Sequence, residues 1–305
     1  MTKSRNLAIL LRTMSPIAPG GIKTVLHRAH AYLQSFPRAV WLLVAATLVE
    51  STGRFMVVPY LSLYMRDAGV SLGTLGLVLG AAPIANIVFG AWGGHLSDKW
   101  GRKPVQILGV GMSGLAMFGF AFAGANPIVL AVLNFFNGMT RTFYRPATNA
   151  AIADFCPANR RSEAYAINRI FLNAAFGLGP ILGVIIFTTA PRAGFMIGGS
   201  LNLAVGLFLA LAVPESAPAR IAARNHAASV LSGGPLAEAV SPSPTPAWRR
   251  IARDAGFWVW IAGMMLVWGS YDLIQSFLPL HLRAGGVALW TYGSILAINA
   301  FVCVV

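Results

Sequence analysis

The sequence predicts an all-α integral membrane protein, and three observations carry this prediction. Hydrophobic residues make up 56% of the 305 positions and charged residues only 10%, whereas soluble domains carry about 25% charged residues. The mean hydropathy of +0.67 leaves too little polar surface to cover a water-soluble protein. Several apolar stretches also reach the roughly 20 residues that a helix needs to cross a bilayer.

Eight apolar segments are expected to form the membrane-spanning helices. Short polar breaks separate the first six, and a longer stretch at 214–254, rich in Ala, Ser, Pro and Arg, precedes the last two. Such a composition predicts a linker with little packed core. The expected spans are 39–65, 72–96, 104–125, 127–150, 165–188, 194–213, 256–281 and 288–305.

The net charge of +14 indicates membrane orientation rather than a nucleic-acid partner. The basic residues lie between apolar segments and do not gather on one patch or helix, which excludes a nucleic-acid interface. Sixteen Lys and Arg residues fall in the N-terminal tail, the second and fourth breaks and the 214–254 stretch, against three on the other side. The positive-inside rule therefore predicts a cytoplasmic N-terminus and a cytoplasmic linker.

An internal repeat relates the first and seventh segments. Shifting the sequence by 217 places Arg66 to Gly76 on Arg283 to Gly293, with identical residue types at the Arg, Gly, Val, Leu, Thr and Gly positions. Six helices, a linker and a restart are typical of membrane proteins built from two parallel halves. The expected organisation is a tail at 1–38, a six-helix half at 39–213, a linker at 214–254 and the start of a second half at 255–305.

The strongest motif is Gly94-His-Leu-Ser-Asp98-Lys-Trp-Gly101-Arg102-Lys103-Pro, between the second and third segments. Gly94 is expected to permit a close helix contact and Gly101 a turn, while Asp98 and Arg102 are expected to form a charged latch. The motif resembles the loop of the major facilitator superfamily, G-x-L-[AS]-D-[RK]-x-G-R-[RK], at every fixed position. The resemblance implies that Asp98 faces a helix end in the second half. It also implies that Arg102 pairs with an acidic residue ending the fourth helix, here Asp154.

The fifth segment resembles the same family's antiporter motif, G-x-x-x-G-P-x-x-G-G. Gly179, Pro180 and Gly183 match, whereas Ala175 and Val184 depart from it. Proline removes a helix hydrogen bond and small residues allow close packing and bending, so a hinge is expected here. The match favours export over import, and a plain small-residue packing face is the alternative.

Charged residues inside the spans are the candidates for coupling. Glu50 and Arg54 lie four residues apart on one helical face, where they can pair. The repeat places Asp272 beside Arg54, so these charges are expected to face each other across the halves. Ionisable residues within spans are functional candidates by default, and burial and nearby arginines change a carboxylate's proton affinity in opposite directions. Buried structural ion pairs are the alternative.

The fourth segment lacks the family's usual arginine, whose place is taken by Asn134. Arg141 and Arg145 follow on the same helical face as Asn134 and Thr148. A role in a central cavity is expected for Arg141, whereas Arg145 either lines the cavity or extends to the membrane interface. The arginine excess over Glu50 favours anionic or zwitterionic cargo.

The resemblance covers about 39–305. It implies a multi-pass transporter of the inner or plasma membrane that exports a small molecule by alternating access. The proton gradient would drive it without a cofactor. The alternatives are uptake or facilitated diffusion, and an inactive truncated fragment. The last alternative arises because a second half that repeats the first would end at about residue 430, which is roughly 125 residues beyond Val305.

The sequence offers no sign of an enzyme. It shows no nucleophile–base set, phosphate loop or metal cluster, and the two cysteines, Cys156 and Cys303, imply neither a disulfide framework nor a metal site. The expected partners are a small-molecule substrate and the lipid bilayer, and the sequence leaves the oligomeric state open.

Overall fold

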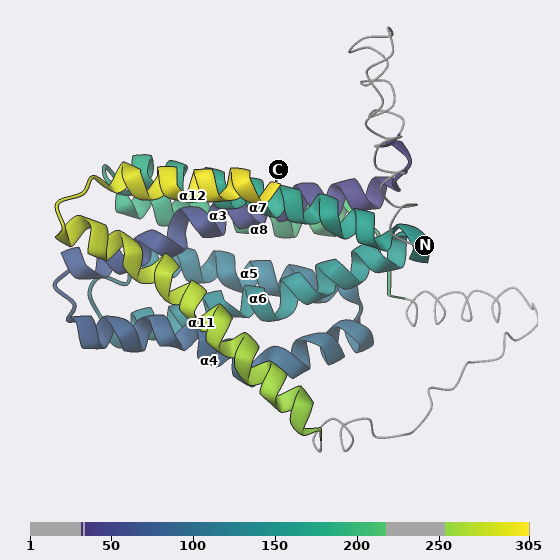
Figure 1. The fold of residues 1–305 in the computed structure, drawn as a ribbon, viewed down its shortest axis with the longest axis horizontal. Helices are drawn as coiled ribbons and strands as arrows, with labels where there is room; N and C mark the ends of the chain where they lie inside the picture. The colour runs from purple at the N-terminus through teal and green to yellow at the C-terminus, as the bar shows by residue number, and fades with distance from the viewer. Residues whose placement is uncertain (1–31, 33, 218–253, 305) are drawn as a thin grey trace, which may run out of the picture. The chain divides into compact units, whose positions relative to one another are not determined.

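The structure is a computed structural model that describes residues 32, 34–217 and 254–304 (Figure 1). The chain divides at Arg38 into two compact units, and the description that follows concerns the second unit, residues 39–305. Most of the expected tail and most of the expected linker, 218–253, lie outside the described residues.

Each expected span coincides with one helix, and the ends differ by at most five residues. The helices are α3 (Arg38–Asp67), α4 (Leu72–Trp100), α5 (Arg102–Phe122), α6 (Pro127–Phe155), α7 (Arg161–Phe187), α8 (Pro191–Ala212), α11 (Ala255–Ala284) and α12 (Leu289–Val304). A short 3₁₀ turn, η1 (Ala158–Arg160), precedes α7.

Polar side chains cap the N-terminal ends of three of these helices. The Ser71 hydroxyl accepts a hydrogen bond from the Thr74 backbone N–H, and the Asp254 carboxylate accepts one from that of Phe257. Asn126 caps α6 in the same way, directly before Pro127. These caps satisfy backbone donors that the first turn of a helix leaves without a partner, which explains why the helices begin where they do.

The repeat seen in the sequence is present in the backbone. α3 ends at Asp67 and α11 at Ala284, which are 217 residues apart, as are the starts of α4 and α12. The turns contain Gly69 and Gly286 at φ of 84° and 73°, a region that favours glycine. In both turns the glycine N–H donates to the carbonyl three residues earlier, at 3.0 and 3.1 Å. The two helix–turn–helix units are therefore copies of one structure.

The packing places α6 between α4 and α5, α8 against α5, and α12 against α7. α3 packs on α7 and α8, and Glu50 in its middle is fully buried. Six described helices are long and apolar enough to cross a membrane; α6 carries more polar residues, and α12 is shorter. Large apolar side chains such as Leu77, Phe122 and Leu211 are more than three-quarters exposed on the bundle surface. A bilayer would bury this surface.

The loops between the helices gather at two ends of the bundle. The motif end is where α4 joins α5 through residues 97–104. The opposite end is where α3 joins α4 and α11 joins α12. Figure 1 shows the α11–α12 turn beside the α3–α4 turn at this opposite end.

Candidate functional site

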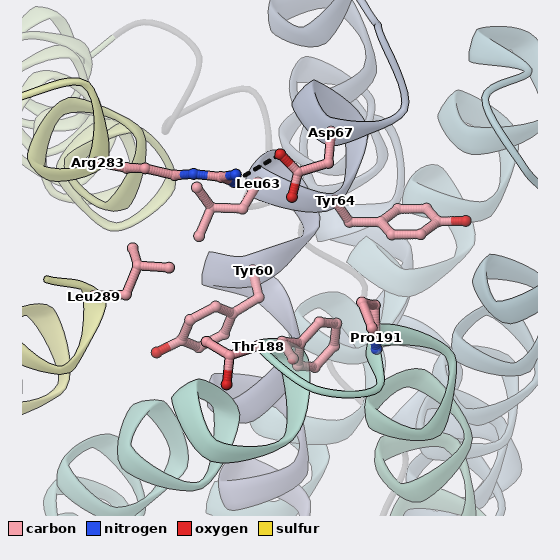
Figure 2. Close-up of a pocket in the computed structure, with 9 residues that line it drawn as sticks. Tyr60, Leu63, Tyr64, Asp67, Thr188, Pro191, Arg283 and Leu289 are labelled. Carbon is pink, nitrogen blue, oxygen red and sulfur yellow. Dashed lines mark ion pairs between the residues drawn. The ribbon is translucent and has the colours of Figure 1, made fainter. Parts of the chain in front are cut away.

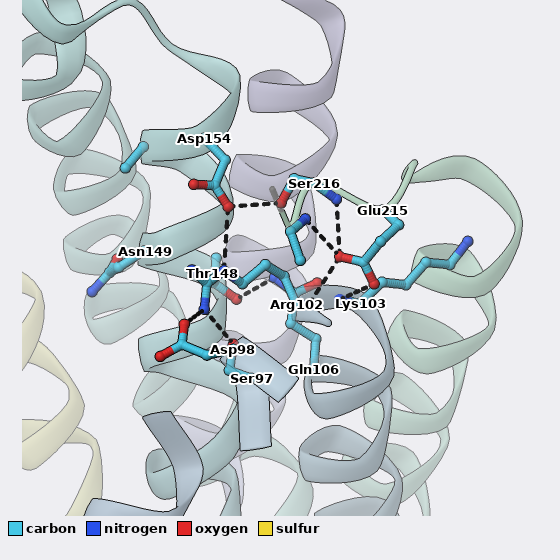
Figure 3. A network of polar contacts seen from close by, with 12 residues as sticks. Ser97, Asp98, Arg102, Lys103, Gln106, Thr148, Asn149, Asp154, Glu215 and Ser216 are labelled. Atoms are coloured by element: carbon cyan, nitrogen blue, oxygen red, sulfur yellow. Dashed lines mark hydrogen bonds and ion pairs between the residues drawn. The ribbon is translucent and has the colours of Figure 1, made fainter. Parts of the chain in front are cut away.

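Arg102 connects the ends of three helices at the motif end (Figure 3). Gly101 makes the turn from α4 into α5 at φ of 102°. The Arg102 guanidinium then forms ion pairs with Asp98 on α4 and with Asp154 on α6, the latter at 3.2 Å. The Asp154 side chain is 17% exposed and that of Asp98 69%, so water screens the Asp154 pair less. A role for this cluster in switching remains a prediction, and the described residues do not test whether Asp98 faces a second-half helix.

Glu215, which follows the C-terminal end of α8, belongs to the same cluster. Its carboxylate accepts hydrogen bonds from the backbone N–H groups of Arg102 and Lys103, at 2.9 and 3.3 Å, where α5 begins. A carboxylate is favoured there because the N-terminal end of a helix carries partial positive charge. The same carboxylate also accepts from the N–H groups of Ser216 and Ala217. The Ser216 hydroxyl in turn donates to Asp154 at 3.3 Å, and the Lys103 ammonium donates to the Ala210 carbonyl.

Glu215 and Ser216 are the residues of this cluster that sequence reasoning missed. The linker was expected to begin at residue 214, yet Val213, Ser216 and Ala217 are at most 4% exposed. The packed structure therefore continues to Ala217. One signal was available, because Glu215 is one of only nine acidic residues and lies directly after an apolar span.

One expectation about the loop motif is wrong. Gly94 was expected to permit a close helix contact, but a Cβ atom there would meet nothing within 4 Å. The close contact lies one residue earlier, because a Cβ on Gly93 would overlap the backbone carbonyl oxygen of Thr142 on α6. The rotation of α4 about its own axis decides which of the two glycines faces α6. The spacing of apolar residues in the sequence did not show this rotation.

Glu50 and Arg54 form an ion pair inside the bundle. Arg54 Nε lies 3.3 Å from Glu50 Oε1, and the Ser51 hydroxyl donates to the other carboxylate oxygen at 2.8 Å. Glu50 is fully buried and Arg54 is 7% exposed. The guanidinium carbon of Arg54 also lies 4.2 Å from the centre of the Phe55 ring, while its Nη2 has no hydrogen-bond partner. The carboxylate is therefore satisfied, and the guanidinium keeps an unused donor.

A small cavity of about 30 Å³ borders Glu50. A volume of this size holds about two water molecules. Its polar lining comes from three helices: Thr47, Glu50 and Ser51 on α3; Tyr144, Arg145, Thr148 and Asn149 on α6; and Asn168 on α7. The Tyr144 hydroxyl and Asn168 Oδ1 are buried without a hydrogen-bond partner. The cavity thus brings polar atoms with unused bonding capacity next to a buried carboxylate.

The structure separates the residues that were grouped on one face of α6. Asn134 donates to the Val78 carbonyl of α4 at 2.9 Å, and Thr148 accepts from Gln106 of α5 at 3.1 Å. Both therefore connect neighbouring helices. Arg145 lines the cavity beside Glu50, and Arg141, one turn earlier on α6, is half-buried. The side chain of Asp272 lies outside the described residues, so its expected position opposite Arg54 stays a prediction.

Gly179 and Gly183 of α7 pack directly on α3. A Cβ on Gly179 would lie 2.6 Å from Phe55 Cβ, and one on Gly183 would lie 2.6 Å from the Met56 carbonyl oxygen. The Pro180 carbonyl accepts a hydrogen bond of 2.7 Å from the Tyr60 hydroxyl. Close packing thus accounts for both glycines, while a hinge at Pro180 stays a prediction. α7 also contacts α12, so it lies on the side of the first half that faces the second.

A larger cavity of about 300 Å³ opens at the opposite end (Figure 2). Asp67 at the end of α3 and Arg283 near the end of α11 lie beside it and form an ion pair of 2.7 Å. The ring of Tyr60 stacks on that of Phe187 at 5.4 Å along its wall. This ion pair connects the first half to the second and was not expected from the sequence.

Metal-binding chemistry finds no support in the described ranges. Within them, no group of three or more His, Cys, Asp and Glu residues is placed to hold a metal ion. Cys156 is buried and Cys303 is exposed, and both are free thiols.

Comparisons with known proteins agree with this architecture. A family model described as "Major Facilitator Superfamily" matches residues 43–305. An uncharacterised transporter of this type from Bacillus subtilis, YqjV, is 26% identical over 270 residues, which cover 86% of this chain and 61% of the relative. The quinolone resistance protein NorA of Staphylococcus aureus is 28% identical over 148 residues, which cover 48% of this chain and 38% of that protein.

Two solved structures share the fold. A D-xylose-proton symporter has a TM-score of 0.63 at 14% identity, covering 87% of this chain and 66% of its own. A bacterial homologue of the human lysosomal transporter Spinster, in an inward-facing and unoccupied conformation, also has a TM-score of 0.63, at 17% identity. That match covers 86% of this chain and 60% of the other.

The helices and the family match define a multi-pass membrane protein. The chain belongs to the major facilitator superfamily, whose members transport small molecules. It spans about 61% of the length of the relative YqjV.

Proposed function

We propose that the protein exports a small molecule in exchange for protons by alternating access, with the motif end facing the cytoplasm of a cell whose plasma membrane holds it. The observation that carries the proposal is the buried carboxylate of Glu50, which lies in the middle of α3 against a polar cavity. A carboxylate within a membrane-spanning bundle is a default candidate for carrying a proton.

The surroundings of Glu50 are suited to binding and releasing a proton. Desolvation favours the neutral form of a buried carboxyl group, whereas a nearby guanidinium favours the ionised form. Arg54 is on the same helix as Glu50, and Arg145 belongs to α6. A movement of α6 relative to α3 would therefore change the charge that lies next to Glu50, and the cavity has room for water that delivers the proton.

Two features support export. NorA, to which half of this chain is similar, is named for quinolone resistance. The Gly179-Pro180 pair of α7 packs against α3 at the boundary between the halves, and the segment resembles an antiporter motif. The basic residues at the motif end support a cytoplasmic location for that end.

The test uses everted membrane vesicles that contain the protein and hold an acidic interior. A quinolone is added outside, and a fluorescent pH probe reports the gradient. Antiport predicts that the quinolone dissipates the gradient with wild-type protein, whereas symport predicts no dissipation in this arrangement. The Glu50→Gln variant should lose the response because it cannot ionise, and Glu163→Gln, altered at the start of α7, should keep it.

Three results would contradict parts of the proposal. A wild-type protein that leaves the gradient intact would contradict proton antiport of quinolones. A Glu50→Gln variant that responds like wild type would show that another group carries the proton. A loss confined to Asp272→Asn would assign the proton to α11 instead.

A further inference from the structure

The cavity at the opposite end takes no part in the proposed proton exchange, and its size suits a small ligand. Its volume of about 300 Å³ lies at the lower limit of the roughly 300–1,000 Å³ that is usual for ligand pockets. Helices α3 and α7, the start of α8 and both described helices of the second half contribute to its wall. A ligand bound there would therefore contact both halves at once.

The larger part of the cavity lining is apolar. The rings of Tyr60 and Phe187 stack with their centres 5.4 Å apart, and the Tyr60 hydroxyl donates to the Pro180 carbonyl, so this part of the wall is held in place. Burial of an apolar ligand group against such a surface is favourable. The residues that form the apolar part are Tyr60, Leu63, Tyr64, Phe187, Pro191 and Leu289.

One ion pair presents both signs of charge to the same cavity (Figure 2). Asp67 Oδ1 and Arg283 Nη1 are 2.7 Å apart, and no hydrogen bond to another described residue involves either side chain. The side chains are 58% and 48% exposed, so the second carboxylate oxygen and the remaining guanidinium donors are open to a ligand. Arg283 would repel a cation here and Asp67 an anion, whereas a molecule with one charge of each sign can pair with both.

We propose that this cavity binds small zwitterions that carry an apolar side group, such as the free amino acid phenylalanine. The ammonium group would donate to Asp67, the carboxylate would accept from Arg283, and the side group would pack against the apolar lining. In an α-amino acid a single carbon atom joins the two charged groups, so both can reach the adjacent side chains. The inference goes beyond the proposed function, because it does not involve Glu50 and binding can be measured without transport.

The test measures binding to the purified protein in lipid nanodiscs, at neutral pH and low ionic strength, where charges are least screened. Phenylalanine, 2-phenylethylammonium and 3-phenylpropionate share one phenyl side group and differ in charge, and glycine carries both charges without a side group. The readout is the shift in the unfolding temperature at equal millimolar concentration, since a ligand that binds the folded state raises it. We expect phenylalanine to raise it by a few degrees and each other probe by less than half as much.

Variants of the ion pair should change the order of the probes. Asp67→Asn leaves the positive charge of Arg283, so phenylpropionate should then give a larger shift than phenylalanine. Arg283→Gln leaves the negative charge of Asp67, so phenylethylammonium should give the largest shift. A general loss of stability cannot produce these two opposite orders. Arg192→Gln is the control, because it removes an exposed charge that does not line the cavity and should keep the wild-type order.

Four outcomes would overturn the inference. They are no shift with phenylalanine, equal shifts with the three phenyl probes, a glycine shift as large as that of phenylalanine, and an unchanged order of the probes in both ion-pair variants. Failure of the proposed function gives a different pattern. A protein that binds phenylalanine in the expected order yet leaves a pH gradient intact fails as an antiporter and keeps this zwitterion site.

Discussion

The Asp67 carboxylate lies 2.7 Å from the Arg283 guanidinium, and this ion pair connects the end of α3 to the end of α11. Arg283 stands where Arg66 stands in the first copy of the repeat, so the two related turns meet at this point. The side chains are 58% and 48% exposed, so the pair contributes at most about 1 kcal/mol. That energy still changes a two-state equilibrium about five-fold.

Removing the ion pair should open the opposite end more often. Leu63 lines the cavity there and is 5% exposed, so a Leu63→Cys reporter should react slowly with a water-soluble maleimide. Adding Asp67→Asn should raise the labelling rate by up to about five-fold. Asp67→Glu keeps the charge and serves as the control. Equal rates in all three proteins would show that the pair does not hold this end closed.

Glu215 should stabilise the motif end, although the sequence predicts that this residue belongs to a linker. The Glu215→Ala variant leaves four backbone N–H donors without their acceptor, including those that begin α5. Loss of a helix cap costs about 1–2 kcal/mol, so the unfolding temperature in detergent should fall by a few degrees. Glu215→Gln keeps one acceptor oxygen and should fall less. A Glu215→Ala protein as stable as wild type would mean that water replaces the carboxylate at no cost.

The thiol of Cys156 reports on the ion pair between Arg102 and Asp154. Burial raises the pKa of this thiol, and the nearby Arg160 and Arg161 oppose that rise. Only the thiolate reacts with iodoacetamide, so alkylation of a Cys303→Ser protein should be slow at neutral pH and should accelerate as the pH rises toward the raised pKa.

Breaking the Arg102 cluster should expose this thiol. Asp154→Asn frees the end of α6 next to Cys156 and should increase the alkylation rate several-fold at every pH. Asp98→Asn should have a smaller effect, because the Asp98 side chain is 69% exposed and its ion pair is well screened by water. A larger effect from Asp98→Asn would reverse the assigned ranking of the two pairs.

Membrane orientation gives a prediction that is independent of transport. In a protein with Cys156→Ser and Cys303→Ser, a membrane-impermeant maleimide added to intact cells should label Arg192→Cys and spare Lys99→Cys. Both positions are exposed, at opposite ends of the bundle, so solvent access alone does not separate them. Labelling in the reverse order would contradict the orientation inferred from the basic residues.

The helices could be predicted from the sequence because a bilayer demands about 20 apolar residues per span, and charged or Gly- and Pro-containing breaks delimit each run. The paired turns at Gly69 and Gly286 followed from a repeat that preserves local residue types. The cap by Glu215 and the ion pair of Asp67 with Arg283 join residues far apart in the chain. Such contacts depend on how the ends of different helices are arranged in space, and a local sequence pattern does not predict this arrangement.

The two interpretations of α7, a hinge and a packing face, predict different variants to be harmful. Gly183→Ala adds a Cβ that would overlap the Tyr60 ring and press on the Met56 carbonyl, so it should destabilise the protein by about 1–3 kcal/mol. Gly80→Ala is the matched control: a Cβ there meets nothing within 4 Å, and alanine favours a helix over glycine by about 0.5–1 kcal/mol.

Pro180→Ala separates bending from packing. The Tyr60 hydroxyl bonds to the backbone carbonyl of residue 180, which alanine also provides, so this contact should survive. Alanine restores an N–H that the helix can use, which should stiffen α7 without lowering the unfolding temperature. A hinge predicts that Pro180→Ala slows transport while the protein stays as stable as wild type. Normal transport by Pro180→Ala, together with a destabilised Gly183→Ala, would leave α7 with a packing role alone.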